Sequence, residues 1–206
     1  MPHKEIFMHL NLFGKLAGGV ILALGLSGCV DVDVDVALTS ASTARATMTQ
    51  TMGAEIYAMV KTSADEAGNG EPGFCDEGDL VENADGSATC SIVEEGPFAD
   101  LDLGQDEGGM RFTEAGPGLV RMALPTADMT AEMGIEDDMD AEARQMVTAF
   151  FEGHDITISF SGAEVVETNM SRAADGRSAS QVIPMLDLIN GTLDLPEELY
   201  AVVRAP

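Results

Sequence analysis

The stretch from Leu26 to Val36, LSGCVDVDVDV, constrains the fold of this chain more than any other feature. A purely apolar run ends at Cys29, and strict alternation of valine and aspartate begins at the next residue. Because successive side chains of a β-strand point to opposite faces, this alternation places the valines on one face and the aspartates on the other. The sequence therefore predicts a half-buried strand that starts immediately after the cysteine.

The 28 residues before this cysteine have the three-part form of an export signal. Lys4 and Lys15 lie in the front part, an apolar segment runs from Leu16 to Leu26, and small residues follow. This apolar segment is shorter than the roughly 20 residues that a spanning helix needs. We therefore expect residues 1–28 to be a cleaved signal and residues 29–206 to form a single domain.

The four residues Leu26-Ser27-Gly28-Cys29 match the bacterial lipobox, in which the cysteine is acylated and becomes the first residue of the mature protein. The alternative is an ordinary signal peptide whose nearby cysteine pairs with another. Several acyl chains on one cysteine hold a protein durably, since each buried methylene contributes about 0.8 kcal/mol. We expect acylated Cys29 to attach the chain to a membrane of the bacterial envelope, facing the periplasm. Val30 is not the aspartate that marks inner-membrane retention in enteric bacteria, which favours the outer membrane.

The chain has three cysteines, and acylation of Cys29 leaves Cys75 and Cys90. In an oxidising compartment we expect these two to form a disulfide that staples a hairpin region around residues 75–90; two free thiols are the alternative. Such a bond contributes about 3 kcal/mol in the chain-entropy model. We expect no metal, because there is no second cysteine pair and His154 is the only histidine after residue 28.

The chain carries 36 acidic and 10 basic side chains, and residues 1–28 hold one of the acidic and two of the basic ones, so the remainder has a net charge near −27. Such a charge repels phosphate groups, which excludes nucleic acid as a partner. The acidic residues are spread along the chain, as on a surface that is soluble in a salty medium. A basic partner protein or diffuse binding of divalent cations is the alternative.

Two segments have the spacing of amphipathic helices. In the first, apolar residues recur at i, i+4, i+7 and i+8 from Met52, and the pattern is lost around Asp65. The second opens near Asp138 or Asp140 and ends at Gly153. Its expected inward residues are Ala143, Met146, Val147, Phe150 and Phe151. Together with the strands expected below, these helices predict an α+β fold.

Short alternating runs bounded by turn residues predict the strands. We expect strands at residues 30–38, 44–52, 79–82, 88–93, 110–114, 119–124, 156–161, 165–169, 178–183 and 200–203. Eleven methionines follow residue 28, and strands curled around the two helices could leave an apolar cavity lined by methionine and phenylalanine.

Chemistry-bearing motifs are scarce. Asp31, Asp33 and Asp35 have the spacing of a calcium loop, but Val36 stands where glycine is required. His154 is the one candidate base for nucleophilic catalysis, and a histidine interacting with a helix C-terminus is the simpler interpretation. No Gly-x-Ser-x-Gly elbow and no phosphate-binding lysine loop occurs, so we expect no cofactor and no enzyme.

The closing block ITISFSGAEVVETNMSRAADGRSASQVIP runs from an alternating strand into a Gly-x-x-Val-x-x-Thr-Asn motif, at Gly162, Val165, Thr168 and Asn169, and then an Asp175-Gly176 turn. With the lipobox, the immediate alternating strand, the second strand and the helix, this block resembles the two ends of LppM-like bacterial lipoproteins. The resemblance implies a mostly antiparallel, curved sheet packed on two principal helices, and a groove for lipid or another hydrophobic ligand. The region around Cys75 departs from that pattern.

These observations lead to three hypotheses of function. The first is a non-enzymatic envelope lipoprotein that binds a hydrophobic molecule, such as lipid, or an envelope protein close to the bilayer. The second is a structural or assembly factor that holds an envelope protein complex through strand edges or its acidic face. The third is an envelope hydrolase that uses His154.

Overall fold

The computed structural model describes residues 30–67, 74–76, 78–104, 109–126 and 141–206. Its strands are β1 (Val30–Leu38), β2 (Thr43–Met52), β3 (Asp79–Glu82), β4 (Ala88–Pro97), β5 (Arg111–Gly116), β6 (Leu119–Pro125), β7 (Asp155–Ser161), β8 (Glu164–Thr168), β9 (Ser171–Arg172), β10 (Ser178–Pro184) and β11 (Glu198–Arg204). Its helices are α2 (Ala54–Ala67), α4 (Ala141–Phe151), α5 (Met185–Ile189) and the 3-10 helix η1 (Phe98–Asp100).

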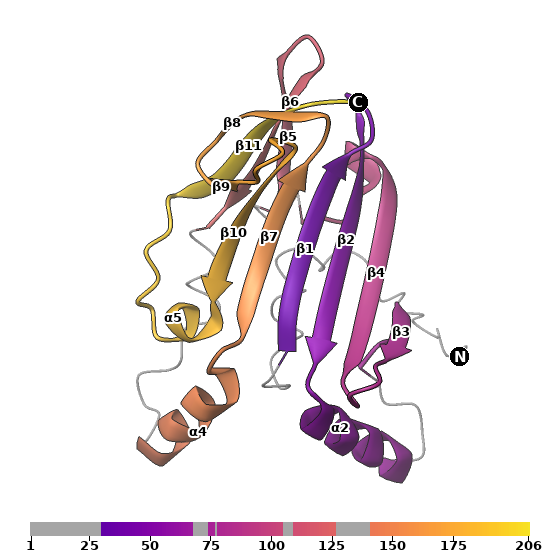
Figure 1. Ribbon diagram of the computed structural model, residues 1–206, viewed down its shortest axis with the longest axis vertical. Coiled ribbons are helices and arrows are strands. Elements are labelled where there is room, and N and C mark those ends of the chain that lie inside the picture. The colour runs from indigo at the N-terminus through magenta and orange to yellow at the C-terminus, as the bar shows by residue number, and fades with distance from the viewer. Residues whose placement is uncertain (1–29, 68–73, 77, 105–108, 127–140) are drawn as a thin grey trace, which may run out of the picture.

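The described strands form two open sheets (Figure 1). The larger sheet has seven strands in the order β3-β4-β2-β1-β7-β10-β9, and the smaller sheet has four in the order β5-β6-β11-β8. Every pair in both sheets is antiparallel except β1 with β7. The prediction of an α+β fold with mostly antiparallel strands is confirmed.

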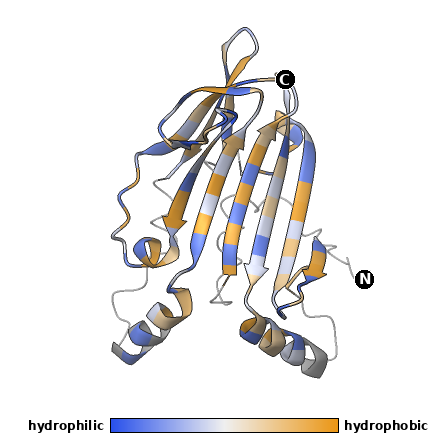
Figure 2. Cartoon of the chain, in the orientation of Figure 1, coloured by the Kyte–Doolittle hydropathy of each residue, from blue (hydrophilic) through white to orange (hydrophobic). Residues whose placement is uncertain are grey.

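The valine/aspartate alternation forms the centre of the larger sheet, and its banding is visible in Figure 2. Val36 has no exposed surface and Asp33 is exposed, as the period-two pattern predicts. β1 pairs with β2 along its whole length, from Val30 opposite Met52 to Leu38 opposite Ala44. The expected hairpin of the first two strands is therefore present.

The core lies between the larger sheet and the smaller one. Val165, Leu199 and Val203 of the smaller sheet have no exposed surface and belong to one cluster with the buried residues of β1 and β7. The two sheets approach closely at Gly162, where an added Cβ would lie 2.5 Å from a methyl carbon of Val203. Only glycine fits between the sheets at this position.

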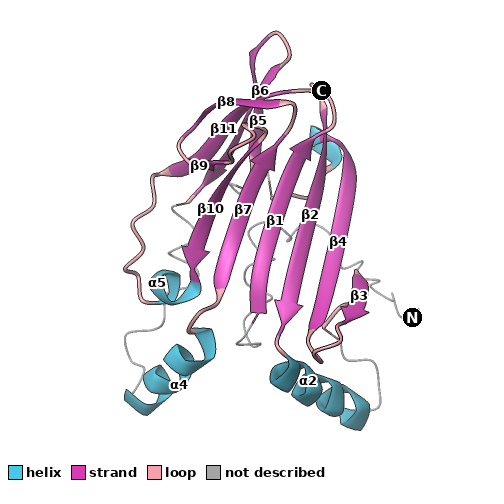
Figure 3. Ribbon diagram, in the orientation of Figure 1, coloured by secondary structure: helices cyan, strands magenta, loops and turns pink. Residues whose placement is uncertain are grey.

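The prediction that the sheet packs on two principal helices is wrong. Three short α-helices occur in the described part of the chain, and they lie beyond one end of the larger sheet, away from its middle (Figure 3). No described side chain of α2 or α4 is buried, and Phe150, expected to point inward, is 39 % exposed. Buried apolar residues of the smaller sheet share one core with those of the larger sheet, and Ile56, Val60 and Phe151 of the helices pack against this core only partly buried.

Candidate functional site

The three α-helices gather at one end of the larger sheet, called the lower end below because it lies at the bottom of Figure 1. The strand register fixes this end: Val30, which begins β1, is opposite Met52, and Met52 is opposite Ala88. α2 follows β2 after one glycine, α4 precedes β7, and α5 follows β10 directly. The lower end is thus where the described chain begins, one residue after Cys29.

His154 ties three elements together at this lower end. Its Nδ1 lies 3.0 Å from a carboxylate oxygen of Asp31 on β1, and the same oxygen accepts the backbone N–H of Asp155 at 3.2 Å. The carbonyl of His154 accepts the N–H of Met185, which begins α5. These contacts make His154 a structural link between β1, β7 and α5. Its ring contacts the Asp31 carboxylate, whereas the simpler interpretation of the sequence placed it against a helix C-terminus.

A row of apolar side chains in the middle of the larger sheet is only half-buried. Val34 lies opposite Met48, and Met48 lies opposite Ile92, so the three form one line across β1, β2 and β4. We call these three residues the apolar strip. Their neighbours two positions away on β1 and β2 are buried. Val34 and Met48 pack against the core cluster, so the strip is a less buried part of this inward face.

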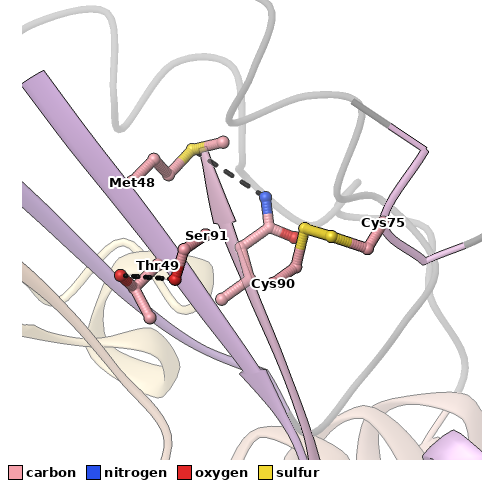
Figure 4. Close-up of a disulfide and its surroundings, with 6 residues drawn as sticks. Met48, Thr49, Cys75, Cys90 and Ser91 are labelled. Atoms are coloured by element: carbon pink, nitrogen blue, oxygen red, sulfur yellow. Dashed lines mark hydrogen bonds between the residues drawn. A yellow bond between two sulfur atoms is a disulfide. The ribbon is translucent and has the colours of Figure 1, made fainter. Parts of the chain in front are cut away.

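A disulfide joins Cys75 and Cys90 beside the strip, and this is the pairing that the sequence predicts. Cys90 is buried on the core side of β4, two residues from Ile92. In Figure 4, Met48 lies on the same side of the strands as the disulfide, while Thr49 and Ser91 face each other on the opposite side. The apolar strip therefore borders the stapled loop.

α2 is held against this same region by polar and aromatic contacts. The Tyr57 hydroxyl donates to Glu82 of β3 at 2.7 Å, and the Lys61 ammonium lies 2.6 Å from the same carboxylate oxygen. Both hydrogen bonds lower the pKa of the Glu82 carboxyl, and the bond from Lys61 has the larger effect. The ring of Tyr57 meets Phe74, next to the disulfide, edge-on at 6.1 Å. The disulfide loop, β3 and α2 thus form a connected unit.

A carboxylate of β4, Glu94, lies close to Asp102, which follows the strand and η1. The backbone N–H of Asp102 donates to Glu94 at 3.0 Å, and one carboxylate oxygen of Asp102 is buried without a hydrogen-bond partner. Burial and then the charge of Glu94 raise the pKa of the Asp102 carboxyl. The loss of hydration at this Asp102 oxygen is therefore not offset by a hydrogen bond.

The outer side of the smaller sheet carries a compact network of paired charges. Arg121 lies 2.6 Å from Glu198 and 4.4 Å from the centre of the Tyr200 ring, and Arg111 lies 3.7 Å from Glu198. The hydrogen bond from Arg121 is the main cause that lowers the pKa of the Glu198 carboxyl. Because Glu198 neutralises much of the positive charge, this network is a poor site for an anion.

The structure can also be compared with the sequence predictions on Cys29, on the aspartates of β1, on metal binding and on membrane-spanning helices. Cys29 lies outside the described residues. Asp31, Asp33 and Asp35 follow one another along the outward face of β1, and among the described residues no group of three histidine, cysteine or carboxylate side chains is arranged to hold a metal. Within the same ranges no helix combines the length and the apolar character that crossing a membrane requires. The apolar strip was missed, because alternation indicates the inward face of a strand but not which part of it is covered.

The fold is thus of the α+β class, with two open sheets and with the described α-helices beyond one end of the larger sheet. No protein-family model matches the chain, and no curated protein matches it. Among solved structures, the chain is similar to the folded domain of the LppM protein of Mycobacterium tuberculosis, with 12 % identity, a TM-score of 0.47, and coverage of 87 % of this chain and 91 % of that one. The resemblance to LppM-like proteins is therefore present but weak.

Proposed function

We propose that this chain is a bacterial envelope lipoprotein, attached to the outer membrane through acylated Cys29, whose domain binds a hydrophobic ligand near the bilayer without catalysing a reaction. The observation that carries the proposal is the apolar strip of Val34, Met48 and Ile92. Covering apolar surface is favourable by about 25 cal/mol per Å². A lipid acyl chain matches this surface because it offers methylenes and no polar group.

The position of the strip fits a ligand taken from the membrane. Val34 is the fifth residue of β1, and a strand rises about 3.3 Å per residue, so the strip is about 13 Å from the start of the strand. The lipobox puts the expected anchor at Cys29, one residue before that start. A lipid that left the bilayer would travel only a short distance to reach the strip.

The surroundings of His154 support a non-enzymatic role. Its ring is bound to Asp31, and its carbonyl is used by α5, so both are engaged in holding the lower end together. Among the described residues no serine or cysteine is recorded within hydrogen-bond distance of the His154 ring, as a nucleophile would be. Unchanged activity of a His154→Ala variant in a hydrolase screen is the expected result.

Native mass spectrometry of the domain from Val30 onward tests the ligand. The domain is purified from a bacterial envelope extract without stripping bound molecules, and we expect an added mass that fragments as lipid. Met48→Gln keeps the length of the side chain but places an amide in the strip, where an unsatisfied amide costs about 1–3 kcal/mol. We expect this variant to lose about tenfold in lipid occupancy or more.

Thr49→Gln is the matched control, because it introduces the same amide into the same strand on the opposite face. It should keep the bound lipid. An equal loss in both variants, or a wild-type domain that carries no lipid at all, contradicts the ligand proposal.

A second candidate function, assembly of an envelope protein complex, is favoured by the free edge of the larger sheet. β3 pairs with β4 only as far as Ser91, so in the described residues the side of β4 that faces away from β2 has no strand beside it from Ile92 to Pro97. Leu80, Val81 and Val93 are exposed along this edge. An open strand edge with apolar side chains can accept a strand from another protein. Cross-linking in intact envelopes tests this function, with Val93→Lys expected to abolish the cross-link.

A further inference from the structure

Gln50 is a buried amide in an apolar row of the larger sheet. It is 8 % exposed and lies on the inward face of β2, between Met48 and Met52 along the strand. Across the sheet it is opposite Val32 of β1 and Cys90 of β4, which are both buried. Burial of an amide among apolar side chains is unfavourable unless its polar atoms are hydrogen-bonded. A glutamine at this position therefore needs hydrogen-bond partners.

The described residues supply only one weak partner to this amide. Its Nε2 donates to the Met48 sulfur at 3.8 Å, a bond drawn as a dashed line in Figure 4. A thioether sulfur is a weak acceptor, and a glutamine amide has two N–H donors and an oxygen with two lone pairs. No hydrogen bond to the Gln50 oxygen is recorded within the part of the chain that the structure describes. Most of the hydrogen-bonding capacity of Gln50 is therefore unused.

The Gln50 oxygen is not sealed inside the core. Among the described residues, only an oxygen of Asp102 is both fully buried and without a hydrogen-bond partner. The unpartnered oxygen of Gln50 therefore keeps some exposed surface, although the residue as a whole is buried. A group from outside the fold can reach this oxygen.

The amide is directed toward the apolar strip, since its acceptor Met48 is the middle residue of that strip. Gln50 is two residues from Met48 on the same face of β2, which is a distance of about 6.6 Å along the strand. It lies on the side of the strip that is nearer the lower end. On β1 and β2 the rows on both sides of the strip are buried, so the strip is one row wide. This width fits a single acyl chain with its head at Gln50.

The charges near the strip disfavour an anionic headgroup. Glu94 is two residues after Ile92 on β4 and therefore on the same face, and Asp102 lies beside it. The net charge near −27 without residues 1–28 adds to the repulsion of an anion. Lys61 of the nearby α2 does not offset it, because its ammonium is paired with Glu82. A neutral headgroup fits this site best.

We propose that Gln50 binds the headgroup of the ligand on the apolar strip, and that this ligand is a neutral single-chain lipid with a hydroxyl or amide head. The proposal rests on the proposed function, because it requires a ligand on the strip. The head donates to the Gln50 oxygen and accepts from the second N–H of Nε2, while the chain covers Val34, Met48 and Ile92. A fatty alcohol or a monoacylglycerol has this chemistry. A fatty-acid carboxylate does not, because it is charged and has no donor.

Photo-labelling of the full-length chain in phosphatidylcholine vesicles tests the headgroup site. The probes are a long-chain primary alcohol with a diazirine in its chain and the methyl ether of the same molecule, which accepts a hydrogen bond but cannot donate one. Tryptic cleavage after Arg45 and Lys61 yields one peptide that contains Met48 and Gln50, and mass spectrometry measures its label. Gln50→Met removes the amide at similar side-chain length. Thr51→Met is the matched control, because it introduces the same residue on the opposite face of the same strand.

We expect the wild-type peptide to be labelled about fivefold more by the alcohol than by the ether, because only the alcohol donates to Gln50. In Gln50→Met, labelling by the alcohol should fall to the level of the ether, whereas Thr51→Met should behave as the wild type does. Gln50→Met should also raise the urea midpoint of the protein without ligand, since it removes an underused amide from the core. Circular dichroism that matches the wild type verifies that each variant is folded.

Failure of this inference is distinguishable from failure of the proposed function. If both probes label the wild-type peptide equally, a ligand binds the strip but Gln50 does not select its head, and the inference is wrong. An equal loss of both probes in Gln50→Met means that Gln50 only shapes the site, which also overturns the inference. If neither probe labels the peptide, no apolar ligand reaches the strip and the proposed function itself fails.

Discussion

At the scale of single residues, the removal of one negative charge should change the free energy of unfolding in opposite directions at Asp102 and at Glu198. One oxygen of Asp102 is buried without a partner, and burial raises its pKa. The contribution of Asp102 to stability is therefore present below the pKa of the unfolded chain and is lost as pH rises through the folded pKa. Glu198 is paired with Arg121, which lowers its pKa. Its contribution is present above the unfolded pKa and is lost as pH falls through the folded pKa.

We predict that Asp102→Asn stabilises the protein at pH 7, because the amide removes a desolvated charge and can donate to the nearby Glu94. Glu198→Gln should destabilise it by less than about 1 kcal/mol, since the pair is one-third exposed and screened by solvent. Urea unfolding at pH 7 and at pH 3 measures both variants. The difference at Asp102 should shrink at pH 3, because a pKa raised by burial keeps this carboxyl protonated there. The difference at Glu198 should shrink as pH falls through its folded pKa. Destabilisation by Asp102→Asn at pH 7 contradicts this account of Asp102.

At the scale of elements, the disulfide should stabilise α2 as well as the loop that contains Cys75. The bond closes a separation of 15 residues, and a loop of this size is worth about 3 kcal/mol in the chain-entropy model. Phe74, beside the bond, contacts Tyr57 of α2. We predict that Cys75→Ala combined with Cys90→Ala lowers the free energy of unfolding by about 3 kcal/mol and speeds amide hydrogen exchange in α2. Exchange in β7 should increase less, and an equal increase in both elements contradicts a local role of the bond.

The elements also show what the sequence can predict. β1, β2 and β7 follow from alternation because each strand has one buried and one open face. The parallel pairing of β1 with β7 does not follow, because a local pattern carries no information about a partner more than a hundred residues away. β4 was predicted to stop at Val93 but continues to Pro97, since pairing with β2 and an ion pair between Arg45 and Glu95 hold its acidic end in the sheet.

In the candidate site, too, some features could be predicted from the sequence and others could not. Cysteine counting was enough to predict the Cys75–Cys90 pair, because only two thiols remained once Cys29 was assigned to the anchor. The apolar strip depends on which rows of the larger sheet remain uncovered, which is a property of the assembled fold. The spacing of Ile56, Met59 and Val60 predicted a helix correctly, but the same spacing occurs in helices that face a core and in helices that face a membrane.

At the scale of the whole molecule, the acidic excess should make stability depend on salt. The chain has a net charge of −26, and its carboxylates repel one another when the protein is compact. Ion pairs such as Arg204 with Glu164 are exposed and contribute little. Screening shortens the range of the repulsion to about 10 Å at 0.1 M salt and about 3 Å at 1 M. The balance favours a protein that becomes more stable as salt is added.

We predict that raising sodium chloride from low to high concentration at pH 7 increases the thermal midpoint of the domain from Val30 onward by about 2–4 °C for each kcal/mol of relieved repulsion. The increase should be smaller near pH 4.5, where part of the carboxylates are neutral, and this comparison separates screening from a general effect of salt on apolar surface. A midpoint that falls with salt at pH 7 would mean that the ion pairs outweigh the repulsion. In that case the acidic surface is an organised network, and its role in contacting a basic envelope partner becomes the stronger interpretation of the charge.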